Sequence, residues 1–406
     1  MKTYIFCLLL LGAFTVHAQD YLTVSGTVKD RITKKPVEYV TISVTDRNTS
    51  TVTNADGFFS LKIPLSEHAA FVDCSHIGYY NFRIPVKDED VALADIFLIP
   101  SAIAIDAVTV YGWEADHLVR EAIKKIGDNY ASQPNRLTGF YRETIRKKRN
   151  YTNITEAVID LYKTAYTESV EQDKVQIIKG RKLLSAKKSD TLAVKLLGGP
   201  AMSVFVDIVK NPDVLLDAEM LDAFLFKIED IMQINERDQY VVTFVPRMVL
   251  PYPLYAGAFY IDKETLAFTR AEFHLDLTDL EKATGVILKK KPLGLRFRPD
   301  NVSYIVSYRE HNDKTYLSYI CNELQFKCDW KKKLFATNYT VVSEMVVTDV
   351  REQDVTAIPR KTAFRTDQSL SEKVSDFYDE NFWGAYNIIE PTESLDAAID
   401  KLKKRQ

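Results

Sequence analysis

The residues best suited to chemistry lie on one short predicted strand, "RAEFHLD", which carries four alternating titratable side chains: Arg270, Glu272, His274 and Asp276. Successive side chains of a strand point to opposite faces, so all four would line one face. Such a face could form a polar site inside a half-barrel or hold a divalent metal. The same alternation is typical of a solvated face on an antiparallel sheet whose other face is buried. We favour the solvated face.

A second candidate is the pair Cys74 and His76 in "DCSHIGY", because a thiol beside an imidazole can act as a nucleophile and its base. The plainer interpretation is a core cysteine with a histidine at the strand end, and we favour it. The other cysteines after the leader, Cys321 and Cys328, lie seven positions apart, which places them on opposite faces of a regular strand. We therefore predict three packing cysteines rather than a disulfide framework.

Side chains that could contact a glycan or a lipid follow two patterns. Tyrosines alternate on predicted strands and could stack on sugars or wrap an acyl chain, although they are equally common cross-strand packing residues: Tyr304, Tyr308, Tyr316 and Tyr319. Basic clusters in "RETIRKKRN" and "ILKKKPLGLRFRP" could bind anionic polysaccharide or lipid head groups. Such charges more often keep turns hydrated and strand edges apart. Neither pattern decides the function.

The motifs of several enzyme classes are missing from the sequence. No histidine stands at the spacing to glutamate that a zinc carboxypeptidase needs, and no His-Glu-x-x-His occurs. A Gly-x-Ser-x-Gly elbow, a phosphate-binding loop and a dinucleotide fingerprint are also missing. We predict a protein that is not an enzyme and has no cofactor and no metal. The formal net charge of -3 gives no field that would recruit nucleic acid.

The first residues, "MKTYIFCLLLLGAFTVHAQD", have the pattern of a secretory signal. A lysine precedes a short apolar run, and small residues end at Ala18, so we predict cleavage between Ala18 and Gln19. Cys7 lies within the apolar run and no lipobox leads to a cysteine at the cut. No later apolar run approaches the roughly 20 residues of a membrane span. We expect an exported protein, periplasmic or associated with the outer membrane.

The elements that would position these residues begin with short strands between residues 22 and 99, separated by turn residues every few positions. The turn "NADG" leads into a strand with Phe59, Leu61 and Ile63 on one face, as in a hairpin of a small antiparallel sandwich. The order "SGTVKD…KPVEYVTISV…STVTNADGFFSLKIP…SHIGYYNFRIPV…IFLIP" resembles the carboxypeptidase regulatory-like domain, a transthyretin-like sandwich. This resemblance implies a non-catalytic domain of the kind found in envelope proteins of Gram-negative bacteria.

After this sandwich the pattern changes. Residues 114–132 predict an amphipathic helix, and the chain from Gly139 is again mainly β, with long hairpins. Residues 198–216, "GGPAMSVFVDIVKNPDVLL", favour a helix. The hairpin "GAFYIDKETLAFTRAEF" is similar to that of periplasmic half-barrels of the lipoprotein-sorting type. The whole chain resembles secreted bacterial proteins that couple the sandwich to a domain of unknown function.

Five segments follow from these patterns: a signal peptide (1–18), a carboxypeptidase regulatory-like β-sandwich (19–100), a linker and helix (101–135), a β-rich domain (136–360) and a C-terminal tail (361–406) with helices at both ends. The predicted fold is mainly β with some α. A transthyretin-like antiparallel sandwich is followed by a larger, half-barrel-like antiparallel sheet with a few helices.

Three functions remain open. The first is a non-catalytic envelope protein whose sandwich docks and whose β-rich domain binds or scaffolds, with an envelope protein, a glycan or a lipid as partner. The second is a periplasmic lipid or lipoprotein carrier with an open half-barrel, which predicts a concave apolar cavity lined partly by helices near 195–225. The third is a hydrolase with an unrecognised site, for which Glu272 and Asp276 are candidates.

Overall fold

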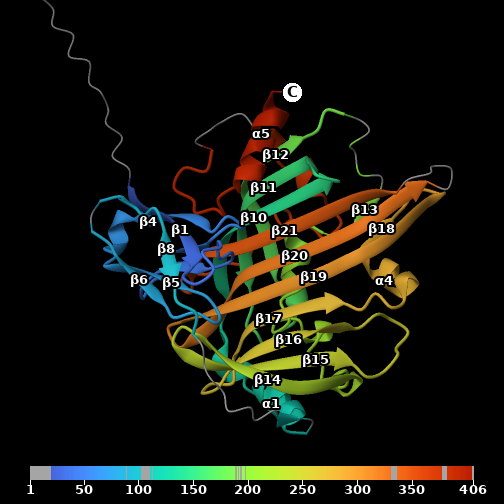
Figure 1. Cartoon of the computed structure of the whole chain (residues 1–406), viewed down its shortest axis with the longest axis horizontal. Helices are drawn as coiled ribbons and strands as arrows, with labels where there is room; N and C mark the ends of the chain where they lie inside the picture. The colour runs from blue at the N-terminus through green and yellow to red at the C-terminus, as the bar shows by residue number, and fades with distance from the viewer. Residues whose placement is uncertain are drawn as a thin grey trace, which may run out of the picture.

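The chain folds into a small β-sandwich packed against one very large antiparallel sheet (Figure 1). The computed structural model describes residues 20–87, 89–101, 110–111, 113–187, 190, 192, 194–196, 198–330, 336–376 and 382–404. The predicted cleavage site at Ala18 and Gln19 lies outside these residues. The observed class is mainly β with some α, as the sequence predicts.

The sandwich consists of two sheets, with strand orders β4-β1-β7, where β8 also pairs with β1, and β3-β2-β5-β6. Its strands are β1 (Tyr21–Asp30), β2 (Thr41–Val44), β3 (Ser50–Val52), β4 (Phe58–Pro64), β5 (Phe71–Ser75), β6 (Phe82–Pro85), β7 (Val91–Ala92) and β8 (Ile96–Leu98). Phe59, Leu61 and Ile63 are fully buried between the two sheets. The alternation in "FFSLKIP" therefore identifies the core face of β4.

The turn before β4 also holds the C-terminal helix α5 (Glu393–Lys403). Gly57 has a φ of 75°, which favours glycine, and the Asn54 side chain accepts hydrogen bonds from the backbone of Asp56 and Phe58. Asp56 Oδ2 accepts a hydrogen bond of 2.7 Å from the backbone N–H of Glu393, the first residue of α5. Asp56 thus places a carboxylate at the positive end of the helix.

Asp56→Ala is expected to lower the free energy of unfolding by about 1 kcal/mol, the usual cost of losing a helix cap. The variant removes an acceptor from the N-terminus of α5 and leaves Gly57 to form the turn. Urea denaturation followed by circular dichroism measures the change. Glu89→Ala serves as the control, since Glu89 is an exposed residue of the same sandwich and has no contact with α5 among the described contacts. Equal losses for the two variants would contradict the capping role.

The large sheet has twelve strands among the described residues, in the order β22-β12-β11-β10-β21-β20-β19-β17-β16-β15-β14-β9. Its bounds are β9 (Val110–Tyr111), β10 (Asn135–Lys147), β11 (Asn150–Lys163), β12 (Lys174–Leu184), β14 (Phe224–Ile234), β15 (Arg237–Pro246), β16 (Tyr255–Asp262), β17 (Phe268–Leu275), β19 (Leu295–His311), β20 (Lys314–Trp330), β21 (Thr337–Arg351) and β22 (Ser375–Asp376). A separate pair joins β13 (Lys195–Leu196) to β18 (Leu288–Lys290).

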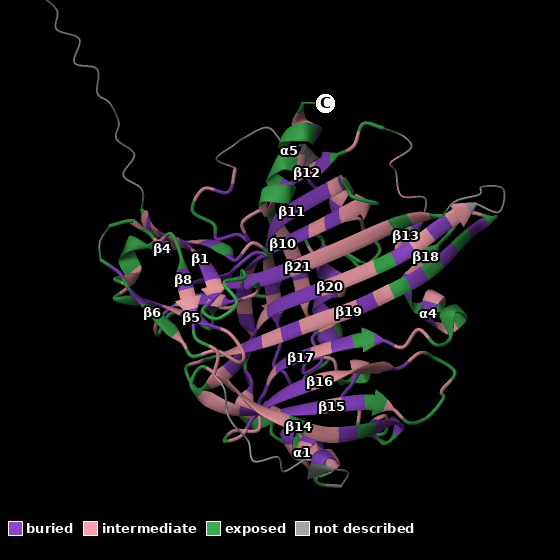
Figure 2. Ribbon diagram, in the orientation of Figure 1, coloured by how far each residue is buried: buried purple, intermediate pink, exposed green. Residues whose placement is uncertain are grey.

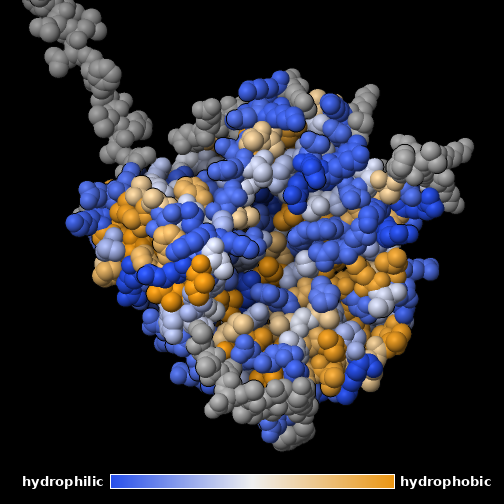
Figure 3. All heavy atoms as spheres, viewed as in Figure 1, coloured by the Kyte–Doolittle hydropathy of each residue, from blue (hydrophilic) through white to orange (hydrophobic). Residues whose placement is uncertain are grey.

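Both faces of this sheet are covered, and Figure 2 shows buried and partly buried residues along its long strands. The outer face carries Phe140 and Val346, which pack with Val52 of the sandwich and Trp383 of the tail. The inner face carries Tyr141 and its neighbours, which pack with the segment after β13. Figure 3 shows the side of the molecule with the sandwich, where hydrophobic side chains gather over the sandwich and the lower strands.

The sandwich is bonded to the large sheet and the tail mainly by polar side chains that reach backbone carbonyls. Ser50 Oγ donates to the Val347 carbonyl at 3.0 Å, and Thr51 Oγ1 donates to the Ile388 carbonyl at 2.9 Å. Arg309 Nη2, from the sheet, donates to the Asn48 carbonyl at 2.8 Å. The sandwich therefore docks within its own chain.

Helices are few and short: α1 (Trp113–Lys124), α2 (Ile126–Asn129), α3 (Pro200–Val204), α4 (Leu280–Ile287) and α5. The predicted helix in residues 198–216 is mostly wrong, because only α3 is α-helical there and a 3-10 turn (Pro212–Val214) follows. β-Branched residues and the Asn211-Pro212 step disfavour its extension. The tail also differs from the prediction: among its described residues only α5 is α-helical, and its first half forms a short 3-10 turn (Leu370–Glu372) and β22.

Candidate ligand-binding cavity

A cavity of about 760 Å³ lies on the inner face of the large sheet. Its floor is formed by neighbouring strands of the sheet, in the spatial order β11, β10, β21, β20, β19, β17 and β16. Its cover is formed by residues 198–214, by α4 and by residues 366–372. We call residues 198–223 the insert. The volume falls in the range of roughly 300–1,000 Å³ that small-molecule sites occupy. The cavity lies where the carrier hypothesis predicts one, beside residues 195–225.

One row of directly paired residues crosses the floor of the cavity: Glu143 on β10, Ser343 on β21, Asn322 on β20, Tyr304 on β19 and Phe273 on β17. All five line the cavity. The first three are polar, while the rings of Tyr304 and Phe273 are stacked with centroids 5.0 Å apart. With neighbouring strands about 4.8 Å apart, the polar half of the row spans about 10 Å over three strands and the aromatic half about 5 Å over two.

The rows on either side of this one are apolar. Two residues further along the strands, the floor is Ile145, Val341, Leu324 and Val302. On the other side the equivalent positions are Tyr141, Met345, Ile320, Val306 and Ala271, all buried in the core. The polar half of the middle row therefore stands between two apolar rows.

The polar side chains at this place form a small cluster, the inner polar patch: Tyr141, Glu143, Ser203, Asn322 and Ser343. The Tyr141 hydroxyl donates to Glu143 Oε2 at 3.2 Å, and Asn322 Nδ2 donates to Ser203 Oγ at 3.4 Å. Asn322 Oδ1 is buried and has no partner among the described residues. Burial raises the pKa of the Glu143 carboxyl, and the hydrogen bond from Tyr141 offsets this only in part.

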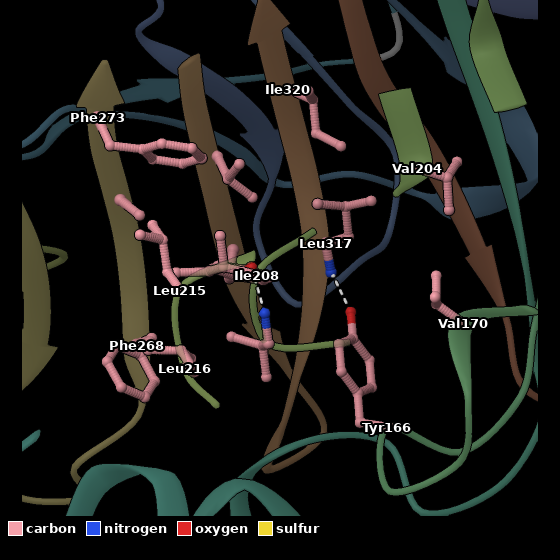
Figure 4. Close-up of a cluster of buried hydrophobic side chains, with 14 of the residues drawn as sticks. Tyr166, Val170, Val204, Ile208, Leu215, Leu216, Phe268, Phe273, Leu317 and Ile320 are labelled. Atoms are coloured by element: carbon pink, nitrogen blue, oxygen red, sulfur yellow. Dashed lines mark hydrogen bonds between the residues drawn. The ribbon is translucent and has the colours of Figure 1, made fainter. Parts of the chain in front are cut away.

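The insert is held on the sheet by apolar and ionic contacts. Ile208, Leu215 and Leu216 pack against Phe268 and neighbouring inner-face residues, as Figure 4 shows. The insert begins at Gly199, whose φ of 91° favours glycine, and Pro200 then starts α3.

A fully buried ionic cluster anchors the middle of the insert. Lys163 Nζ on β11 lies 2.9 Å from Asp207 Oδ2 and 3.2 Å from Asp173 Oδ2. Tyr308 donates to Asp207 Oδ1 at 2.8 Å, and Lys210 donates to Thr164 Oγ1 at 2.8 Å. We call Lys163, Asp173, Asp207 and Lys210 the ionic anchor.

The two lysines of the ionic anchor respond differently to their surroundings. Burial lowers the pKa of Lys163, but Asp207 and Asp173 outweigh this effect and leave it raised. Burial lowers the pKa of Lys210, and here Asp173 does not compensate. Both ammonium groups are nevertheless supplied with oxygen partners, so the cluster has a structural explanation.

The predicted polar face of β17 lies on the outer side of the sheet, away from the cavity. Arg270 is buried, with Nε 2.6 Å from Glu272 Oε1 and Nη1 donating to Ser307 Oγ at 3.0 Å. His274 is exposed, and Asp276 lies beyond the strand end, where it accepts from the Thr278 N–H. Only the first two are brought together. Among the described residues, no group of three or more potential ligands is placed to hold a metal.

Cys74 and His76 lie in and beside the sandwich core. Burial raises the pKa of the Cys74 thiol to about 12 and lowers that of His76 to about 4. A neutral thiol and a neutral imidazole match the packing interpretation rather than a thiolate–imidazolium pair. The three described cysteines are free and buried.

The tyrosine series divides between the two faces. Tyr304 lines the cavity, Tyr308 bonds the ionic anchor, and Tyr316 donates to Glu352. Tyr319 lies on the outer face, where its hydroxyl donates to Glu344 Oε1 at 3.1 Å. Tyr304 is therefore the one member of this series that lines the large cavity.

A second cavity, of about 600 Å³, lies between the sandwich and the turns that join β14 to β15 and β19 to β20. Its walls are mainly polar, and two of its arginines are paired with carboxylates: Arg83 with Asp73 at 2.6 Å and Arg237 with Asp262 at 2.8 Å. It lacks the apolar rows of the first cavity. We therefore consider the inner-face cavity the candidate site.

Comparison with known proteins gives a domain for the N-terminal part. Residues 24–110 match the family described as CarboxypepD_reg-like domain. No curated protein matches the chain. A DUF1329 family protein from Desulfovibrio piger ATCC 29098 is 10% identical with a TM-score of 0.24, covering 60% of this chain and 93% of its own. A protein of unknown function from Bacteroides fragilis NCTC 9343 is 11% identical with a TM-score of 0.15, covering 82% and 100%.

These TM-scores are too low to support an argument about function, so the cavity must be interpreted from its own geometry. No helix among the described residues is both long enough and apolar enough to cross a membrane. The family match begins within β1 and ends in β9, and thus includes the sandwich except for the first residues of β1. The N-terminal part of this chain therefore matches the carboxypeptidase regulatory-like domain, and it is joined here to a large antiparallel sheet.

Proposed function

We propose that this protein is an exported, non-catalytic carrier of the cell envelope that holds the acyl chain of a lipid in the inner-face cavity. The observation that supports the proposal is the cavity of about 760 Å³ beside the apolar row Ile145, Val341, Leu324 and Val302. Its size and its apolar floor fit a small-molecule site, which is typically concave and lined mainly by apolar side chains. The cover formed by the insert would keep water from a bound chain.

The energetics suit an acyl chain. Each methylene removed from water contributes about 0.8 kcal/mol. A chain with ten buried methylenes would therefore gain roughly 8 kcal/mol, the scale of micromolar binding before ordering costs are subtracted. The apolar floor provides this gain without any specific contact.

The sandwich would serve as the docking module of the carrier. Its polar contacts to Val347 and Ile388 support a role in fixing the outer face and the tail. The signal-like N-terminus supports the periplasm or the outer membrane as the compartment. An envelope protein would then be the partner to which the lipid is passed.

Leu324→Trp is expected to weaken the binding of N-phenyl-1-naphthylamine, a neutral apolar fluorescent probe, more than tenfold. The larger ring would occupy the space of at least two methylenes, about 1.6 kcal/mol. The matched control is Leu225→Trp, an exposed residue on β14 that does not line the cavity. Fluorescence titration of residues 19–406 measures both. Similar affinities in the wild type and the two variants would contradict binding in the cavity.

Native mass spectrometry of the protein purified from the envelope of its own host tests the carrier role independently. A bound mass of lipid size, lost on denaturation and missing from Leu324→Trp, is the expected result. A bare protein mass in both forms would favour a scaffold and argue against the carrier.

A further inference from the structure

The inner polar patch places hydrogen-bonding side chains in the cavity at positions where the sheet does not require them. Its Asn322 Oδ1 is buried without a partner among the described residues, and burying such an atom costs about 1–3 kcal/mol. The row that contains Glu143, Ser343 and Asn322 is flanked on both sides by apolar rows, so the sheet could be completed with apolar residues here. In the aromatic half of the same row, the inner face already carries the large side chains of Tyr304 and Phe273.

The hydrogen-bonding capacity of the patch is only partly used. Among the described residues, Glu143 has no ion-pair partner, and its carboxyl accepts one hydrogen bond, from Tyr141. Asn322 Oδ1 has no partner. In the ionic anchor, by contrast, each lysine has oxygen partners within hydrogen-bond distance. Because buried polar groups are satisfied in native proteins, an unused set beside a cavity indicates a ligand group.

Building on the proposed function, we infer that the patch binds the head group of the lipid and selects an uncharged head that bears hydroxyls, such as an acylglycerol. A hydroxyl can donate to Glu143 or to Asn322 Oδ1 and can accept from the second N–H of Asn322 Nδ2, so it matches acceptors and donors together. The acyl chain would extend over the apolar row and the rings of Tyr304 and Phe273.

The same patch disfavours a free fatty acid. Its carboxylate would be placed beside the Glu143 carboxyl in apolar surroundings, and like charges at such a site repel strongly. The raised pKa of Glu143 agrees with this arrangement, since the site already resists one negative charge. The lysine of the cavity lining, Lys289, is exposed, and no arginine or lysine is among the described groups that act on the Glu143 carboxyl.

The test is displacement of N-phenyl-1-naphthylamine by three ligands with the same chain: 1-myristoylglycerol, myristate and myristylamine, at pH 7.5 and low salt. The wild type is expected to bind myristoylglycerol at least tenfold more tightly than myristate. Glu143→Gln is expected to reduce this ratio below threefold, because the amide keeps donor and acceptor but removes the charge. Glu264→Gln, at an exposed position in the turn between β16 and β17 and outside the cavity lining, should keep the wild-type ratio.

The folding of Glu143→Gln is checked by its melting temperature, which should not fall below that of the wild type at pH 7.5. The pKa of Glu143 is raised in the folded state, so stability is lost as pH rises from the unfolded value through the folded one. The Glu143→Gln variant does not lose stability in this way, because glutamine does not ionise. A lower melting temperature with an unchanged ligand ratio would overturn the inference and indicate a structural role for Glu143.

The outcomes separate this inference from the function on which it rests. Equal affinities for the ester and the acid in the wild type would overturn the head-group assignment and leave acyl binding intact. Tightest binding of myristylamine, weakened by Glu143→Gln, would also overturn it in favour of a cationic head. If no ligand displaces the probe, and Leu324→Trp binds the probe as the wild type does, the carrier proposal and this inference both fail.

Discussion

Asp207→Ala should destabilise the protein by about 3–5 kcal/mol, because it removes one carboxylate from the buried ionic anchor. Asp207 Oδ2 lies 2.9 Å from Lys163 Nζ, and its Oδ1 accepts from Tyr308 at 2.8 Å. Both of these partners are buried in the core. Without Asp207, two lysines would share the single carboxylate of Asp173, and a buried ammonium group would be left without full compensation. Guanidinium denaturation measures the change.

Asp222→Ala is the control, because Asp222 forms an exposed ion pair with Arg120 at 2.7 Å. Exposed pairs contribute about 0–1 kcal/mol, so this variant should unfold nearly as the wild type does. Since Asp207 lies in the insert that covers the cavity, Asp207→Ala should also lose probe binding at temperatures where the sheet remains folded. A loss of stability below 1 kcal/mol would show that the anchor does not hold the insert.

The sequence predicts the sandwich well because its signals are local. In β4 the alternation of Phe59, Leu61 and Ile63 matches one buried face and one more exposed face, and Asp56-Gly57 provides the turn. The long hairpins of the second domain are equally visible, since polar turns separate strands with β-branched and aromatic residues. Fold class therefore follows from patterns within single hairpins.

The candidate site could not be found in the same way. Both faces of the large sheet are covered, so alternation on β10 does not show which face is inner: Phe140 and Tyr141 are both fully buried, one on each side. Glu143 faces the cavity, whereas its neighbour Arg142 faces the tail on the outer side. Glu143 comes near Asn322 only because β10 pairs with β21 and β21 pairs with β20, strands that are distant from β10 in sequence.

The sequence of the insert contains one indication that this segment is buried against the sheet. Asp207 and Lys210 interrupt an otherwise apolar run, and charged residues in such a run are rarely buried unless they are paired. The run as a whole favours a helix, whereas the structure brings both side chains to the ionic anchor, whose Lys163 lies on β11. The partners, Lys163 and Asp173, are too distant in sequence to be recognised from the run itself.

Glu156→Gln should cost about 3–5 kcal/mol at neutral pH, because Glu156 lies buried between two arginines on the outer face. Glu156 Oε1 is 2.7 Å from Arg142 Nη2, and Glu156 Oε2 is 2.7 Å from Arg181 Nε. Arg142 Nη2 also donates to the Ile389 carbonyl at 2.7 Å, so the cluster holds the tail on the sheet. The amide would present donors to a guanidinium group and leave one arginine buried without its partner.

A second ion pair across neighbouring strands provides the control: Arg296 Nε and Asp329 Oδ1 lie 2.8 Å apart, but the arginine side chain is 62% exposed. Asp329→Asn should therefore cost less than about 1 kcal/mol. The two pairs have nearly the same contact distance and differ in burial. If both variants unfold alike, burial of the Glu156 cluster contributes little and the tail is held by apolar contacts alone.

The pH dependence separates charge from packing in this cluster. Burial alone would raise the pKa of Glu156, but Arg142 and Arg181 outweigh it and leave the pKa lowered. A carboxyl whose pKa is lowered on folding stabilises the protein above its unfolded pKa, about 4.3, and this stability is lost as pH falls through the folded value. The difference between the wild type and Glu156→Gln should therefore be constant near neutral pH and shrink below about pH 4. A difference that persists unchanged at acid pH would assign the loss to packing of the glutamine and not to the missing charge.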